Sequence, residues 1–66
     1  MSCAHQLYRT MSKERFVSEA WLIRTLRLPY RTVRAGLLTL LALGSIEVAT
    51  MKHGRLKPMR IYRRRR

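Results

Sequence analysis

The sequence predicts an α+β fold, mainly α, in which three helices are followed by a C-terminal two-stranded β-hairpin. Three observations predict it. Apolar residues recur at the three- and four-residue spacing of helices through residues 3–43. Pro29 divides this helical pattern, and from Ile46 onward apolar and polar residues alternate as they do in strands. A chain of 66 residues holds one small domain, expected at residues 1–62, with a flexible arginine tail at residues 63–66.

The first helix is expected from about Cys3 to Lys13, with Ser2 as a candidate N-cap. Four apolar residues at helical spacing form its stripe: Ala4, Leu7, Tyr8 and Met11.

Ser18 gives a stronger start signal, because serine is a favoured N-cap and Glu19 suits the positive end of a helix dipole. The second helix is therefore expected from Glu19 to about Leu26. It must end before Pro29, because the residue ahead of a proline is pushed out of the helical region. Trp21 is expected to pack in the core or between helices rather than to stack on a base.

Pro29 opens the third helix, where its missing N–H costs nothing at the first turn. The core-facing stripe of this helix is expected to be Val33, Leu37, Leu40 and Leu41. Gly44 follows the last periodic residue, as a left-handed terminator does. Gly36 lowers the helix propensity by about 1 kcal/mol relative to alanine, which indicates close packing on another helix.

The last third of the chain predicts a hairpin with strands at residues 46–51 and 56–62. A two-residue turn at His53 and Gly54 would set three facing pairs: Ile46 with Ile61, Glu47 with Arg60, and Val48 with Met59. The alternative is a longer loop from Lys52 to Pro58. Pro58 cannot donate to a strand ladder and indicates an edge strand or a bulge.

The charge is strongly one-sided, with fifteen Lys and Arg against three Asp and Glu, a formal net charge of +12. This balance favours a polyanionic partner, nucleic acid before anionic membrane. A fold of this size has little room for a catalytic cleft, and the few acids and histidines form no paired acid–base set. We therefore expect neither an enzyme nor a bound cofactor or small-molecule ligand.

Cysteine and hydropathy patterns favour an intracellular, cytoplasmic protein that does not enter membranes. Cys3 is the single cysteine, so no intrachain disulfide forms. Cys3, His5 and His53 lack the paired spacing and the fourth ligand of a zinc site, so no metal is expected. The most apolar run, residues 35–46, is shorter than the ~20 residues a spanning helix needs.

The segment from Val17 to Tyr62 resembles the winged helix-turn-helix domains of prokaryotic transcriptional regulators. The resemblance is carried by Leu28, Thr32-Val33-Arg34, Leu37, Leu40 and Leu43-Gly44-Ser45-Ile46. It implies a three-helix domain with a hairpin wing and double-stranded DNA as its partner. It also implies that residues 30–43 form a recognition helix in the major groove and that the wing at 52–58 contacts phosphates or the minor groove.

Candidate contact residues lie in three places. On the recognition helix they are Tyr30, Arg31, Thr32, Arg34 and Ala35, with the two arginines reading guanine and Tyr30 and Thr32 binding phosphate. On the wing they are Lys52, His53, Arg55 and Lys57, and on the tail Arg63, Arg64, Arg65 and Arg66. The simpler interpretation is that these groups form solvated faces.

Three function classes remain open at this stage. The first is a sequence-specific DNA-binding regulator, expected to be a repressor and a homodimer joined through its first helix or through Leu38 and Leu41. A bending or recombination accessory protein of a mobile element belongs to the same binding class. The second is binding to structured or ribosomal RNA. The third is a membrane-active or protein-binding module.

Overall fold

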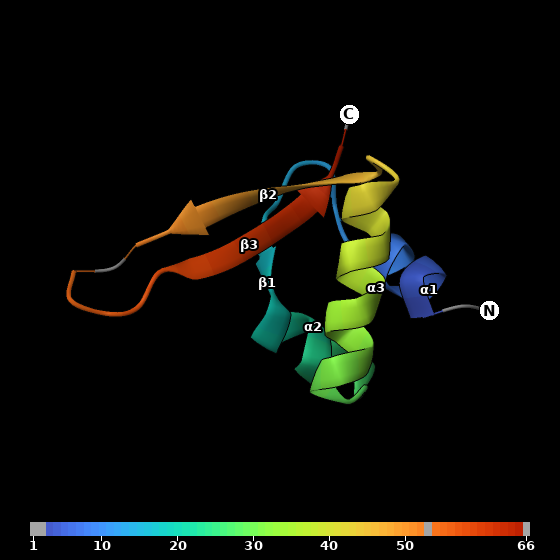
Figure 1. Cartoon of the computed structure of the whole chain (residues 1–66), viewed down its shortest axis with the longest axis horizontal. Helices are drawn as coiled ribbons and strands as arrows, with labels where there is room; N and C mark the ends of the chain where they lie inside the picture. Colours follow the sequence, from blue (N-terminus) through green and yellow to red (C-terminus); the bar gives the residue numbers. More distant parts are fainter. Residues whose placement is uncertain (1–2, 53, 66) are drawn as a thin grey trace.

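The computed structural model describes residues 3–52 and 54–65, and there it contains three helices and one three-stranded antiparallel sheet (Figure 1). The elements in chain order are α1 (Cys3–Thr10), β1 (Val17–Ser18), α2 (Glu19–Leu26), α3 (Tyr30–Ala42), β2 (Ile46–Met51) and β3 (Met59–Arg64). The strand order is β1-β3-β2. The α+β class is therefore confirmed, and a short first strand joins the expected hairpin.

The bounds of α2 and α3 follow from local signals that the sequence carries. Ser18 caps α2, since its backbone is extended and its hydroxyl accepts a hydrogen bond from the amide of Trp21 at 3.1 Å. Arg27, in the left-handed conformation at φ 54°, ends α2 ahead of Pro29. Gly44, at φ 72°, ends α3 with the paired amide hydrogen bonds of a Schellman motif.

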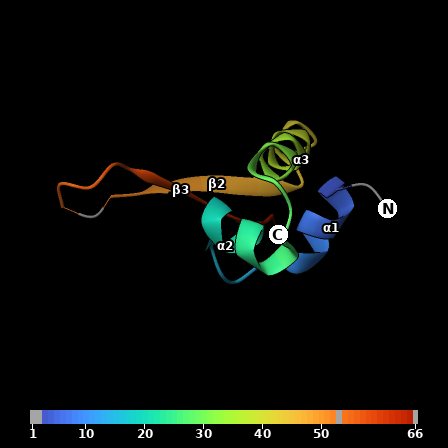
Figure 2. The ribbon, with the colours of Figure 1, turned by 90° about the horizontal axis from the view of Figure 1, so that it is seen from below.

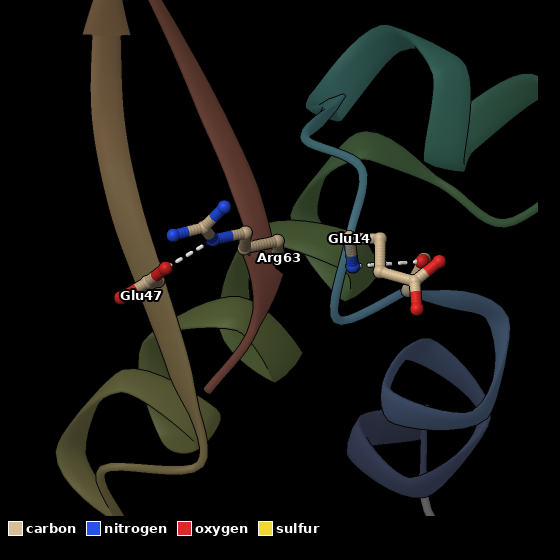
Figure 3. Close-up of polar contacts among 4 residues, drawn as sticks. Glu14, Glu47 and Arg63 are labelled. Carbon is tan, nitrogen blue, oxygen red and sulfur yellow. Dashed lines mark hydrogen bonds and ion pairs between the residues drawn. The ribbon is translucent and has the colours of Figure 1, made fainter. Parts of the chain in front are cut away.

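The helix α1 ends at Thr10, three residues earlier than the apolar stripe predicts. Beyond it, the hydroxyl of Ser12 accepts a hydrogen bond from the amide of Glu14 at 3.0 Å (Figure 3). A serine that bonds its own neighbouring backbone competes with helix formation, and this local turn explains the early end.

The core lies where the helices meet the sheet. Its buried members are Leu7, Met11, Val17, Leu22, Val33, Leu37, Leu40, Ile46 and Tyr62. The predicted stripes of α1 and α3 supply most of this set, with Ala4, Tyr8 and Leu41 packed at its margin. The prediction for Trp21 was wrong, because its side chain lies outside this core and is 39% exposed.

Gly36 is buried where α3 crosses α1, which confirms the close packing inferred from the sequence. A Cβ atom at this position would overlap the Cδ1 atom of Leu7, and Leu7 is itself fully buried. The two helices approach this closely because α3 carries no side chain at the crossing.

We expect Gly36→Ala to lower the free energy of unfolding by about 1–2 kcal/mol. Overpacking a core costs ~1–3 kcal/mol, and the better helix propensity of alanine returns up to ~1 kcal/mol. Urea unfolding followed by circular dichroism measures the difference. A gain in stability would show that the better helix propensity of alanine dominates and that the Leu7 side chain moves aside at little energetic cost.

The strand register differs from the predicted one. In the structure Glu47 faces Arg63, Val48 faces Tyr62, Ala49 faces Ile61 and Met51 faces Met59. The facing pairs expected from a two-residue turn were wrong, because β2 ends at Met51 and β3 begins only at Met59, as the alternative of a longer connection has it. His53 itself lies outside the described residues. A shift by an odd number of residues reverses which side of β3 faces the helices, so Tyr62 rather than Ile61 is buried.

The expected tail boundary after Tyr62 was also wrong for the first two arginines. Arg63 and Arg64 belong to β3 and pair with Glu47 and Ile46 of β2. Four consecutive arginines are too charged to fold by themselves, but partners from distant parts of the chain stabilise these two side chains. Arg63 contacts the Phe16 ring and the Glu47 carboxylate, and Arg64 contacts the ring and the carbonyl group of Tyr8.

Candidate nucleic-acid interface

The outer face of α3 carries most of the residues predicted to read nucleic acid. Tyr30, Arg31, Arg34 and Ala35 are exposed, whereas Thr32 is partly buried toward α1. Tyr30 and Arg34 lie on the flank of this outer face toward α2 and the hairpin, whereas Arg31 and Ala35 lie on the flank toward the start of α1. The same face continues through Leu38, which is 58% exposed.

Arg34 and Tyr30 lie one helical turn apart and contact each other. The Nη1 group of Arg34 donates a hydrogen bond to the Tyr30 hydroxyl, and the guanidinium carbon lies 5.8 Å from the ring centroid. This hydrogen bond raises the pKa of Arg34, whose guanidinium group is charged at neutral pH in any case. The predicted phosphate contact of Tyr30 therefore has a competing partner within the protein.

A groove of about 450 Å³ separates α2 and the start of α3 from the loop end of β3. Its lining residues are Ser18, Glu19, Ala20, Ile23, Tyr30, Arg34, Pro58, Met59 and Arg60. Arg34 and Arg60 thus border one concave surface. The sequence interpretation missed Arg60, although its position two residues before Tyr62 places both on the same side of β3.

Glu19 brings a carboxylate to this groove and is tied to the core. Its Oε1 atom accepts a hydrogen bond from the Tyr62 hydroxyl at 3.0 Å. Burial raises the pKa of Tyr62, and the hydrogen bond to Glu19 raises it further. The acid therefore satisfies the polar end of a buried tyrosine.

The hairpin loop extends away from the helices, as both views show (Figures 1 and 2). Lys52, Arg55 and Lys57 are all exposed there. A Cβ atom added at Gly54 would meet nothing within 4 Å, so the loop is open at that point. His53, also predicted as a contact, lies outside the described residues.

The arginines at the end of the chain divide into two kinds. Arg63 forms an ion pair with Glu47 (Figure 3). Its guanidinium carbon lies 4.4 Å from the centroid of the Phe16 ring. Arg64 donates a hydrogen bond from Nε to the carbonyl group of Tyr8 at 2.7 Å. Its guanidinium carbon lies 4.3 Å from the centroid of the Tyr8 ring. Arg65 is exposed, and Arg66 lies outside the described residues.

Other kinds of site find little support in residues 3–52 and 54–65. No three His, Cys, Asp or Glu side chains there come together in a way that could hold a metal ion. No helix in the same part of the chain combines the length and apolar character needed to cross a membrane.

Known proteins give no indication of function for this chain. The chain matches no protein-family model, no curated protein and no solved structure. Its function is therefore inferred from the outer face of α3, the groove beside it and the hairpin loop.

Proposed function

We propose that the chain is a winged helix-turn-helix protein that binds double-stranded DNA sequence-specifically and acts as a small transcriptional repressor. The observation that supports the proposal is the exposed N-terminal half of α3, where Arg31 and Arg34 are both exposed and Arg34 borders a groove shared with the hairpin. In this account α2 and α3 are the helix-turn-helix, and β2, β3 and their loop are the wing.

The dimensions fit this use. An α-helix with its side chains is about 10–12 Å wide, and the major groove of B-DNA is about 12 Å wide. With α3 in the groove, Arg31 and Arg34 reach base edges, where arginine pairs with O6 and N7 of guanine. Thr32 and the cations of the hairpin loop contact phosphates, which supplies affinity without sequence information.

Charge supports the same partner. Of the three acids, Glu47 is paired with Arg63, and the Glu19 carboxylate lies in the groove that Arg34 lines. Arg31 on α3 and the cations of the hairpin loop have no such acid beside them in the part of the chain that the structure describes. Occupancy of a promoter would block polymerase, which is the basis for proposing a repressor. A homodimer on a two-fold site would extend the reach of so small a domain, and exposed Leu38 is a candidate contact between copies.

A competition assay tests the class of partner. Labelled random duplex DNA bound to the protein is challenged with unlabelled duplex DNA, structured RNA or vesicles containing anionic lipid, all at physiological salt. We expect duplex DNA to compete best at equal phosphate concentration. Preferential displacement by RNA would overturn the proposal in favour of an RNA-binding protein, and displacement by vesicles would favour a membrane-surface module.

A further inference from the structure

We propose that Tyr30 is a positioning residue, which holds the guanidinium group of Arg34 in the orientation that reads a guanine. This inference rests on the proposed function and deepens it. It also revises the role expected for Tyr30, whose hydroxyl the sequence assigns to a phosphate.

The geometry separates Arg34 from the other arginine on the same face. Arg34 is exposed, yet its Nη1 atom is bonded to the Tyr30 hydroxyl and its charge lies near the Tyr30 ring. Within the described part of the chain, Arg31 has no such hydrogen bond or ring contact. One of the two candidate reading residues is thus held by a neighbour, and the other is not.

The contact leaves the reading edge of Arg34 available. A guanidinium presents five N–H donors in a planar fork, and the bond to Tyr30 uses one of those on Nη1. The parallel donors on Nε and Nη2 remain, and two parallel donors are what the N7 and O6 acceptors of guanine require. Tyr30 therefore restrains the side chain without occupying the edge that would pair with the base.

Restraint before binding should sharpen recognition. A long side chain on a helix surface loses rotamer freedom when it docks, and a partner that already orders it reduces that loss. Tyr30 is 50% exposed and lies at the first residue of α3, outside the buried core, so its hydroxyl is dispensable for folding. The hydrogen bond from Arg34 to this hydroxyl can therefore be removed to test its effect on DNA binding without unfolding the protein.

A double-mutant cycle tests the proposal. The probes are a duplex selected by the protein and the same duplex with 7-deazaguanine in place of the guanine read by Arg34. We expect Tyr30→Phe to reduce the affinity ratio of these duplexes roughly three- to tenfold through lost preorganisation. In an Arg34→Ala background the same change should have no further effect. Arg31→Ala is the matched control background. There Tyr30→Phe should reduce the affinity ratio by the same factor as it does in the wild-type protein.

The outcomes separate the alternatives. If Tyr30→Phe weakens both duplexes equally, with or without Arg34, then Tyr30 is a phosphate contact and the proposal is wrong. The free protein gives a second readout, the NMR order parameter of the Arg34 Nε–H group, which should fall in Tyr30→Phe. Equal order in both proteins would also overturn the proposal. If no duplex is selected at all, the proposed function fails, whereas the NMR result still decides whether Tyr30 holds Arg34.

Discussion

Deletion of residues 63–66 is expected to lower the free energy of unfolding by about 3–5 kcal/mol, which is most of the stability of so small a domain. The four arginines look like a detachable tail in the sequence. In the structure, however, the strand β3 continues through Arg64, and its last residues join α1, β2 and the loop between α1 and β1.

Several contacts account for that loss. The amide of Arg64 donates to the carbonyl of Ser12 at 2.8 Å, and the amide of Arg65 to that of Ser45 at 3.1 Å. The Nε atom of Arg64 donates to the carbonyl of Tyr8, and a hydrogen bond from a charged group contributes ~1.5–3 kcal/mol. Each cation–π contact, on Phe16 and on Tyr8, adds ~0.5–1 kcal/mol.

Urea unfolding of the shortened chain and of Arg65→Ser provides the comparison. Arg65 is exposed, so the serine variant loses charge but keeps β3 intact, and its unfolding midpoint should stay near that of the full chain. An unchanged midpoint in the shortened chain would contradict the role of Arg63 and Arg64 in the fold. Weaker DNA binding by the shortened chain would then be a direct loss of contacts.

Arg34→Ala should reduce the preference for the selected duplex over its guanine-substituted variant by about 10- to 100-fold, the range expected for a lost bidentate pair. The substitution should leave the fold intact, because Arg34 is exposed on α3 and lies outside the buried core. Fluorescence anisotropy with both duplexes at one salt concentration measures the ratio.

Arg24→Ala is the matched control, since it removes the same charge from an exposed position on α2. We expect it to weaken binding to both duplexes by a similar factor, as loss of a general electrostatic contribution does. If Arg34→Ala behaves in the same way, Arg34 is a phosphate contact and the reading role passes to Arg31 or to other groups.

Local signals predicted the helical part of the fold well. Ser18 as a cap, Pro29 as a break and Gly44 as a terminator each act within a few residues, and the structure confirms all three positions. The exposed face of α3 was predicted for the same reason, because helical periodicity alone decides which side is buried. Gly36 also correctly indicated a tertiary contact, the crossing of α3 with α1.

The register of the hairpin could not be predicted from local sequence signals. Both the predicted and the observed registers pair apolar residues with each other and give Glu47 an arginine partner, so the pattern could not choose between them. The choice depends on tertiary contacts, in which Tyr62 enters the core and its hydroxyl meets Glu19. The strand β1, of two residues, is too short for any periodicity to show.

Prediction of the candidate site residues also depended on contacts between distant parts of the chain. Arg63 and Arg64 were predicted as nucleic-acid contacts because a run of four arginines is too charged to fold by itself and suits a flexible arm. Phe16 and Tyr8 supply those partners only once the chain has folded. Arg60 was missed because its place beside Arg34 follows from the true register.

Sequence-specific recognition by α3 is best measured by selecting bound sites from a pool of random DNA duplexes. We expect the wild-type protein to enrich a short motif containing guanine, with two-fold symmetry if copies bind as a dimer, and we expect Arg34→Ala to lose the guanine position. Recovery of sequences no different from the starting pool, although the protein binds them, would contradict sequence-specific recognition by α3.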